Sequence, residues 1–163
     1  NVPENIFPFQ SYSEVIAYFH HVEKNISIST WIRTYKCSNI ERREAKTLYE
    51  LITLLEKEGF TNWLVYRIPS SLDLAFAHLS SMITERTLSV EMIREVRKNL
   101  PIQSRNELKV SGKELIDLFP NRKRGAWIEQ LLVALEKNVV LNKLKNDNHL
   151  IKECILCHPQ EID

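Results

Sequence analysis

The sequence contains few of the residues that make tight turns: of its 163 residues, only 3 are glycine and 6 are proline. Leucine, isoleucine, glutamate and lysine are abundant instead, a composition typical of helical proteins. Because 44% of the residues are hydrophobic, the chain can bury a core. We therefore predict an all-α fold, in which a bundle of short amphipathic helices is followed by a smaller helical domain.

Membrane and secretion signals are also absent. No apolar run approaches the length of a membrane span, and no basic segment followed by an apolar one opens the chain, so we expect no membrane partner. The 3 cysteines are an odd number and form no disulfide framework, which favours reduced thiols in the cytoplasm. The first residue is Asn1 and not methionine, which suggests a piece of a longer protein.

The usual sequence signatures of catalysis are missing too. There is no glycine-rich phosphate loop, no close pair of aspartates, no nucleophile elbow and no His-Glu-x-x-His, so we expect no catalytic residue and no metal site. Cys154, Cys157 and His158 superficially match a haem attachment motif or half of a zinc site, but a second Cys/His pair is absent. His20 and His21 are adjacent, and adjacent helical residues point about 100° apart, which disfavours a shared metal ion.

Three Ser-x-x-Glu sequences have the form of a capping box, which marks the start of a helix. They begin at Ser11, Ser38 and Ser111. Behind the second box, apolar residues recur at helical spacing until Gly59, a natural stop. The residues predicted to face the core of this helix are Ala45, Leu48, Leu51, Ile52 and Leu55.

A break in the helical pattern at Asn99-Leu100-Pro101 predicts a division into two domains, 1–100 and 101–163. Beyond it, a possible extended stretch at 107–110 precedes a long helix predicted from about 126 to 141. Further helices are expected to begin at Ser71, Ser89 and Asp147, Asn142 is expected to adopt a left-handed conformation, and the three tryptophans, Trp31, Trp63 and Trp127, are expected to pack in the core.

The net charge is only +1, so any binding of nucleic acid must depend on local patches. Between Arg105 and Arg124 there are six basic residues against three acidic ones. Arg122-Lys123-Arg124-Gly125 stands directly before the long helix, where free backbone N–H groups and the positive end of the dipole favour a phosphate. A solvated loop is the alternative, but cations at a helix start are unfavourable unless an anion binds there.

A second basic group surrounds the start of the helix that follows Ser38. It consists of Lys36, Asn39, Arg42 and Arg43, with Ser38 as the cap. Two glutamates in the same stretch dilute the charge, so a salt-bridged helical surface is the alternative to a phosphate site.

Several of these segments resemble bacterial-type (class II) CCA-adding enzymes, which are tRNA nucleotidyltransferases. The Leu-Pro-Ile stretch at 100–102 and the segment 107–115, Glu-Leu-Lys-Val-Ser-Gly-Lys-Glu-Leu, are similar to the entry of the family's tail domain. A basic glycine-containing turn, a long helix and then an asparagine, here Asn146, follow at corresponding spacings. Arg124 and Ala126 depart from the pattern, since prolines flank the glycine in many relatives, and Glu129 replaces a frequent small residue.

The resemblance implies an enzyme of four parts, head, neck, body and tail, of which this chain is similar to the body (1–100) and the tail (101–163). Such enzymes add C, C and A to the tRNA 3′ end with CTP and ATP, and carboxylates in the head bind Mg²⁺. Neither the head nor the neck motif is found here, so the missing N-terminal head and neck would supply catalysis, and the fragment alone should be inactive. Relatives that add only A, only CC or poly(A) share this body-and-tail plan.

The partner implied for body and tail is tRNA, contacted through backbone phosphates of the acceptor arm and elbow. A helical protein-interaction or regulatory module without RNA binding is the alternative. The predicted RNA-binding residues of the tail are Lys109, Ser111, Gly112, Lys113, Arg122, Lys123, Arg124 and Gly125, and those of the body are Lys36, Ser38, Asn39, Arg42 and Arg43.

Overall fold

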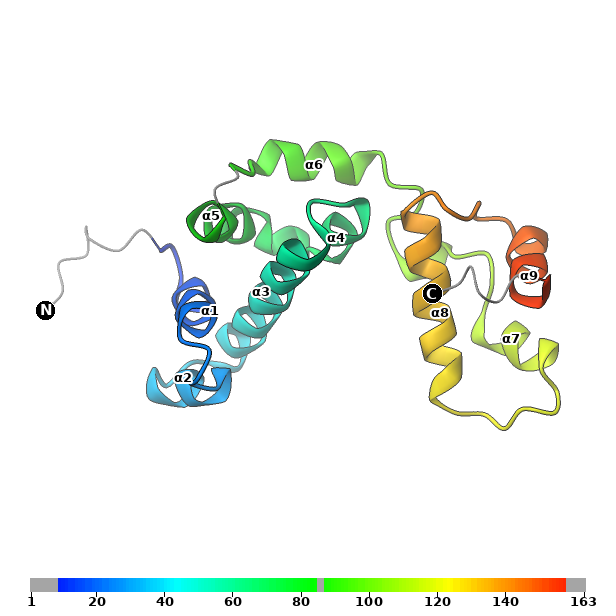
Figure 1. Ribbon diagram of the computed structural model, residues 1–163, viewed down its shortest axis with the longest axis horizontal. Coiled ribbons are helices and arrows are strands. Elements are labelled where there is room, and N and C mark those ends of the chain that lie inside the picture. The colour runs from blue at the N-terminus through cyan, green and yellow to red at the C-terminus, as the bar shows by residue number, and fades with distance from the viewer. Residues whose placement is uncertain (1–8, 85–86, 158–163) are drawn as a thin grey trace, which may run out of the picture. The chain divides into compact units, whose positions relative to one another are not determined.

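A computed structural model describes residues 9–84 and 87–157 of the chain (Figure 1). These residues form nine α-helices and two short 3₁₀ helices, and none of them forms a β-strand. The predicted all-α fold is therefore confirmed. In chain order the elements are α1 (Tyr12–Val22), α2 (Ile28–Thr34), α3 (Asn39–Glu58), α4 (Asn62–Arg67), η1 (Ser70–Leu72), α5 (Asp73–Ile83), α6 (Val90–Lys98), η2 (Arg105–Glu107), α7 (Gly112–Leu118), α8 (Ala126–Val140) and α9 (Asn148–Cys157).

The chain divides into two compact units, Asn1–Val96 and Arg97–Asp163. Helix α6 runs across this division. The predicted division into a body domain, 1–100, and a tail domain, 101–163, stays a prediction. Within the described ranges, no helix combines the length and the apolar character needed to cross a membrane.

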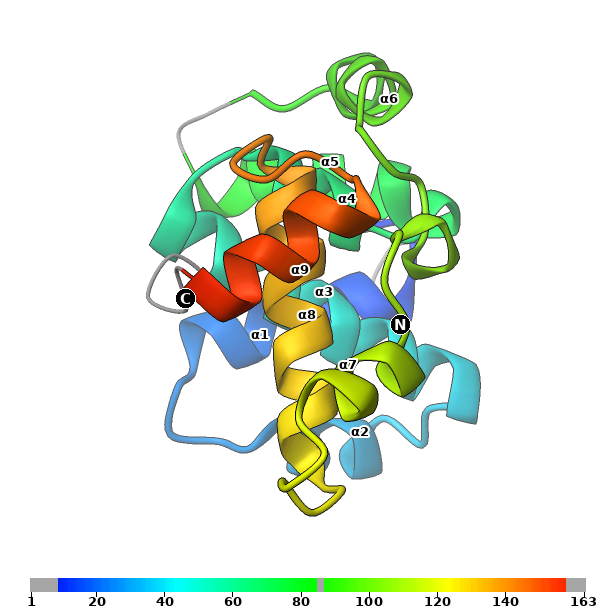
Figure 2. The same ribbon diagram turned by 90° about the vertical axis from the view of Figure 1, so that its right-hand side faces the viewer.

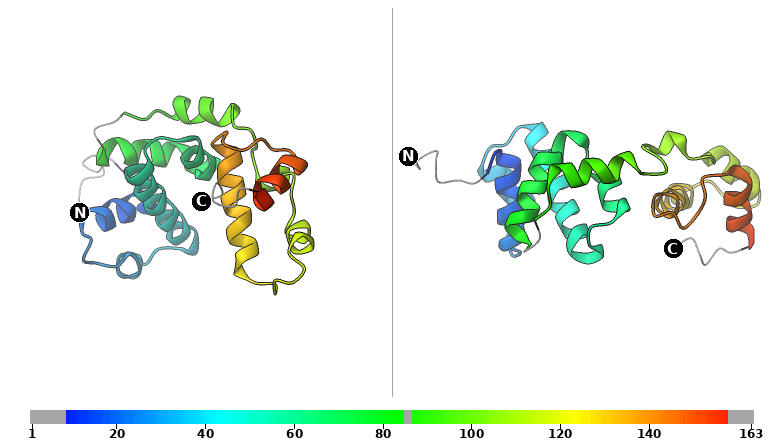
Figure 3. Two further views of the ribbon diagram at one scale, coloured as in Figure 1. Left: turned by 45° about the vertical axis from the view of Figure 1, so that its right-hand side comes forward. Right: turned by 90° about the horizontal axis from the view of Figure 1, so that it is seen from above.

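Helix α3 is central to the first unit and contacts α1, α4 and α5 (Figure 3). All five residues predicted for its core face are buried, at 4% exposure or less. Ile16 of α1, Ile32 of α2 and Ala45 of α3 form one buried cluster, against which Trp31 and Cys37 pack. Burial of each large aliphatic side chain stabilises the unit by about 1.5–3 kcal/mol, so α3 owes its position mainly to this face.

Two of the three predicted capping boxes are complete. Ser38 and Ser111 each accept the N–H of the glutamate three residues later, and that glutamate accepts the serine N–H in return. Ser11 also accepts the Glu14 N–H, but the Glu14 carboxylate accepts the Gln10 N–H instead and is buried. This box is half formed, because tertiary packing takes the Glu14 side chain into the core beside His78, whose Nδ1 lies 2.8 Å from Oε2.

The remaining helix starts agree with the sequence in two cases out of three. Ser89 accepts the Met92 N–H at the start of α6, and Asp147 accepts the His149 and Leu150 N–H groups at the start of α9. The prediction for Ser71 is wrong: this residue lies within η1, and α5 begins at Asp73 without a side-chain cap.

In the second unit, α7 and α9 lie on the same side of α8, as Figures 1 and 2 both show. The buried apolar residues of α8 are Leu135, Val139 and Val140, towards its C-terminal end. The helix ends before Asn142, which has the predicted left-handed conformation (φ 57°). The stretch 107–110 forms no strand, because η2 and the bonds described below hold it. Of the cysteine motif, Cys154 is half-buried, Cys157 is exposed and His158 lies outside the described residues.

Candidate nucleic-acid interface

The turn between α7 and α8 is organised by Trp127, which was predicted as a core residue and is in fact half-buried against this turn. Its indole N–H donates to the Lys123 carbonyl oxygen at 2.8 Å. The Phe119 ring stands edge-on to the indole, with centroids 5.7 Å apart, and the Arg122 guanidinium carbon lies 4.4 Å from the Trp127 ring centroid. Three contacts therefore hold the basic turn in one conformation.

The N-terminus of α8 has no side-chain cap. Gly125 occupies the N-cap position with an extended backbone, and its carbonyl oxygen accepts the Ile128 N–H at 3.2 Å. The first N–H groups of a helix have no partner within the helix and carry the positive end of the dipole. Lys123 and Arg124 are exposed beside this end and form no ion pair within the described part of the chain. Backbone and side chains thus present positive charge together.

The one acidic residue in the first turn of α8, Glu129, is paired. Arg105 Nη1 lies 2.6 Å from Glu129 Oε1, and Arg105 Nε and Nη2 donate to Glu136 Oε2 at 3.0 and 2.8 Å. The bonds to Glu136 and then to Glu129 raise the pKa of Arg105. Arg105 is therefore occupied within the fold, and its charge offsets that of Glu129 beside the helix end.

Asn146, which belongs to the pattern of the resemblance, holds the segment before α7 by hydrogen bonds. Its Oδ1 accepts the Lys109 N–H at 2.9 Å, and its Nδ2 donates to the Glu107 carbonyl oxygen at 2.8 Å. One side chain thus makes two bonds to the backbone of this segment. The Lys109 side chain is left exposed at the surface.

Glu114 ties the start of α7 to α9. Its carboxylate accepts bonds from Lys152 Nζ at 2.8 Å, from Asn148 Nδ2 at 3.0 Å and from the Ser111 N–H at 3.0 Å. These donors, Lys152 first, lower the pKa of Glu114 to about 2. The Ser111 hydroxyl also donates to the Glu114 carboxylate and accepts the Glu114 N–H. The predicted site residue Ser111 therefore caps α7 within the fold.

Gly112 faces α8 at close range. A Cβ atom at this position would lie 3.3 Å from Ile128 Cγ2 and 3.7 Å from Leu132 Cδ1. The glycine therefore allows α7 to approach α8 closely. Lys113, the next residue, is exposed. The structure brings Lys109, Ser111, Gly112 and Lys113 together at one helix start, and Arg122, Lys123, Arg124 and Gly125 at another.

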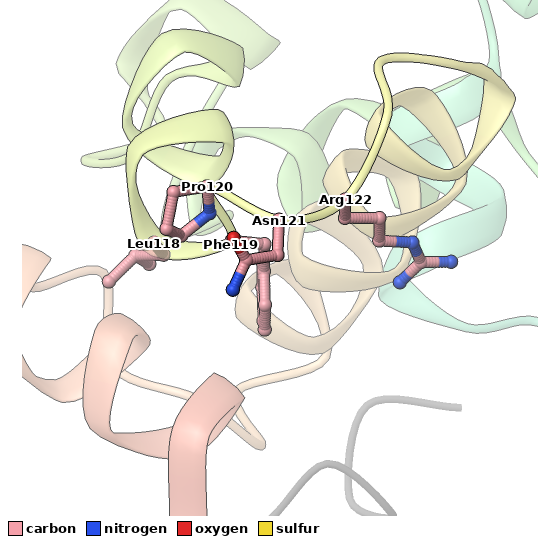
Figure 4. Close-up of a pocket in the computed structure, with 5 residues that line it drawn as sticks. All are labelled: Leu118, Phe119, Pro120, Asn121 and Arg122. Carbon is pink, nitrogen blue, oxygen red and sulfur yellow. The ribbon is translucent and has the colours of Figure 1, made fainter.

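A hollow of about 410 Å³ adjoins the basic turn and is lined by Leu118, Phe119, Pro120, Asn121 and Arg122 (Figure 4). In Figure 4 the side chains of Phe119 and Asn121 point to the same side of the turn, whereas Arg122 extends away from them. The turn therefore presents an apolar wall with one amide next to its cations.

The predicted body residues separate into two groups. Lys36 and Arg42 line a hollow of about 460 Å³, together with Arg33 and Lys46, which the sequence analysis missed. Ser38, Asn39 and Arg43 are exposed but lie outside the lining. The four-residue spacing of Arg42 and Lys46 on one face of α3 was the available signal for Lys46.

Metal-binding side chains do not converge in the part of the chain that the structure describes, where no group of three His, Cys, Asp or Glu residues could hold an ion. The adjacent histidines have separate neighbours: His20 Nδ1 lies 2.8 Å from the Ile26 carbonyl oxygen, and His21 Nε2 lies 3.4 Å from Glu56 Oε1. The described residues therefore bring together no donor set for Mg²⁺, which the resemblance implies for the head and not for this part of the enzyme.

Comparisons with known proteins agree with the helical fold. The sequence pattern of the family "tRNA nucleotidyltransferase domain 2" matches residues 7–155. The CCA-adding enzyme of Oceanobacillus iheyensis is 38% identical over 155 residues, which are 95% of this chain and 39% of that enzyme. The CCA-adding enzyme of Staphylococcus saprophyticus is 24% identical, with 93% of this chain and 39% of that enzyme covered.

A solved structure has a similar helical fold. The crystal structure of the Bacillus stearothermophilus CCA-adding enzyme in complex with CTP superposes with a TM-score of 0.73 at 21% identity, covering 94% of this chain and 39% of that one. The chain thus spans about two fifths of the length of the relatives that it matches.

Proposed function

This chain belongs to the tRNA nucleotidyltransferase family, as its domain 2, and on that premise we propose that it is the tRNA-binding body and tail of a CCA-adding enzyme. The complete enzyme would extend the tRNA 3′ end with CTP and ATP in the cytoplasm. Nucleotidyl transfer and its Mg²⁺ would belong to a head and neck outside this chain, which fits the two fifths of its relatives' length that the chain spans. The part played by these residues is to bind and orient tRNA.

The observation that carries the proposal is the uncapped start of α8 beside Lys123 and Arg124. Cations at this end of a helix oppose its dipole by a few tenths of a kcal/mol each, so the arrangement is unfavourable until an anion binds. A phosphate would accept backbone N–H bonds and pair with both side chains. A-form RNA is recognised mainly through its phosphates and 2′-hydroxyls, which fits such a site.

Rigidity of the turn favours the same function. The Trp127 contacts fix the turn before any ligand arrives, so less conformational entropy is lost on binding. Arg122 stacks on the indole, yet the edge of a stacked guanidinium can still donate to a phosphate. Lys109 and Lys113, held at the start of α7 by Asn146 and Glu114, would extend the contact along the backbone.

The test is tRNA binding by the complete protein, measured between 50 and 200 mM salt for wild type and for Lys123→Ala/Arg124→Ala. Loss of two phosphate contacts should weaken binding and reduce the slope of log affinity against log salt by about 1.4 to 1.8. Lys143→Ala/Lys145→Ala, in the same unit and beyond the other end of α8, removes equal charge and should change the slope far less. Equal slopes for the two double variants would contradict the proposal.

A further inference from the structure

The hollow of about 460 Å³ in the first unit lies where α2 ends and α3 begins. Ser29 and Arg33 line it from α2, and Arg42 and Lys46 from α3. Members of each pair are four residues apart and therefore share a helix face. Its volume falls within the roughly 300–1,000 Å³ of ordinary ligand sites.

The lining of this hollow is positive and has no acidic member. Arg33, Lys36, Arg42 and Lys46 all contribute to it, and none of them forms an ion pair within the described ranges. Burial, with a smaller effect of nearby Glu41, raises the pKa of the Cys37 thiol, so this lining residue brings no negative charge. Four cations thus surround one space, with Glu41 nearby but outside the lining.

The corner between α2 and α3 holds a lysine in a backbone conformation that usually belongs to glycine. Lys36 has φ 50°, its N–H donates to the Arg33 carbonyl oxygen, and the Cys37 N–H donates to the Ile32 carbonyl oxygen, both at 3.3 Å. This is the Schellman pattern of a helix end, in which the left-handed residue is usually glycine. A lysine there costs of order 1 kcal/mol, and such strain is typically retained at functional sites.

The lining also indicates which chemistry the hollow would recognise. Its polar groups are cations and the Ser29 hydroxyl, and no aromatic ring or amide side chain contributes to it. An arginine can also stack on a base or bond guanine, but four cations around one space match the negative charge that every phosphate carries, whatever its base. The ligand chemistry is therefore that of a sugar–phosphate backbone.

We propose that this hollow binds backbone phosphates of tRNA, with Arg33, Lys36, Arg42 and Lys46 as the ligands. The inference rests on the proposed function, to which it adds a second contact, in the first unit. Compared with the residues predicted from the sequence, the site also includes Arg33 and Lys46 and does not include Ser38 and Arg43. The Ser38 hydroxyl and N–H both bond Glu41, and Arg43 Nε donates to the Asn39 carbonyl oxygen.

Two variants of the complete protein test this site by salt-dependent tRNA binding. Arg33→Ala/Lys46→Ala changes two exposed helical positions and should reduce the slope of log affinity against log salt by about 1.4 to 1.8. The ratio of wild-type affinity to variant affinity should therefore fall roughly 7- to 12-fold between 50 and 200 mM salt. Lys24→Ala/Lys57→Ala, at exposed positions of the same unit, is the matched control. Lys36→Gly should raise the midpoint of thermal unfolding and yet weaken tRNA binding, a pairing that a purely structural role would not produce.

The outcomes separate this inference from the proposed function. If Arg33→Ala/Lys46→Ala binds tRNA like its control while Lys123→Ala/Arg124→Ala loses affinity, the hollow is not a phosphate site and the proposed function stands. If wild type binds no tRNA, both fail. Free CTP is the other phosphate source: its binding should be equal in wild type and Arg33→Ala/Lys46→Ala, and a loss confined to CTP would overturn the assignment to RNA.

Discussion

Replacing Asn146 with alanine should loosen the segment that carries Lys109 without removing any charge. The variant loses two bonds, from the Lys109 N–H at 2.9 Å and to the Glu107 carbonyl oxygen at 2.8 Å. Each such bond stabilises a fold by about 0.5–1.5 kcal/mol net, so the local loss is about 1–3 kcal/mol. This corresponds to roughly 5- to 150-fold faster hydrogen exchange at the Lys109 amide.

The same variant distinguishes positioning from direct phosphate contact. If Lys109 must be held in place to bind tRNA, the affinity should fall in proportion to the fraction of molecules in which the segment is still ordered. The slope of log affinity against log salt should not change, because no cation is lost. Amide exchange followed by NMR and tRNA titration of the same samples measure the two effects. Asn106→Ala is the control, since Asn106 is an exposed asparagine of the same segment whose side chain makes no hydrogen bond in the described part of the chain. Unchanged Lys109 exchange in the Asn146 variant would refute the reasoning.

Three further predictions concern stability. The bonds to Glu114 hold its pKa at about 2, below the ordinary 4.5, so its ionised form stabilises the fold in full above about pH 4.5. This contribution to the free energy of unfolding is lost as the pH falls from 4.5 toward 2. Glu114→Gln should therefore make the free energy of unfolding less dependent on pH in that range. Arg105→Met should destabilise by about 1–3 kcal/mol in urea titration, because the Glu136 carboxylate, whose side chain is 6% exposed, loses two charge-assisted bonds from Arg105. Since the Arg105 side chain is 39% exposed, the loss should stay below that of a fully buried pair, and a neutral result would contradict the role of the pair. Leu48→Ala, at a fully buried position, should lower the free energy of unfolding by about 2–5 kcal/mol. Leu74→Ala, at 55% exposure, should change it by no more than about 0.5 kcal/mol, and equal effects of the two variants would contradict the assignment of Leu48 to the core.

Local patterns in the sequence were enough to find the helices. The core face of α3 could be predicted from spacing alone, because the apolar residues of this 20-residue amphipathic helix lie along one face, which packs away from water. The boxes at Ser38 and Ser111 involve residues three apart, and the left-handed Asn142 follows from its own tolerance of that conformation. These features depend on neighbours in the chain, which the sequence shows directly.

Features that depend on distant residues could not be found in this way. Glu14 leaves its capping box for His78, 64 residues away. Ser71 loses its capping role because the chain enters α5 through a 3₁₀ turn in which Leu72 is buried. Arg33 and Lys46 come to share a hollow with Lys36 and Arg42 only when α2 and α3 meet, so the pattern around Ser38 alone could not bring these four residues together.

The uncapped start of α8 has a consequence for how its sequence can change. Peptide N–H groups are supplied by every residue except proline, so a site built on a helix end places few demands on side-chain identity. The resemblance would place proline beside the glycine, where this chain has Ala126 at the first helical position. Alanine keeps the N–H that proline lacks, so Ala126 leaves one more hydrogen-bond donor at the helix end where the proposed anion would lie.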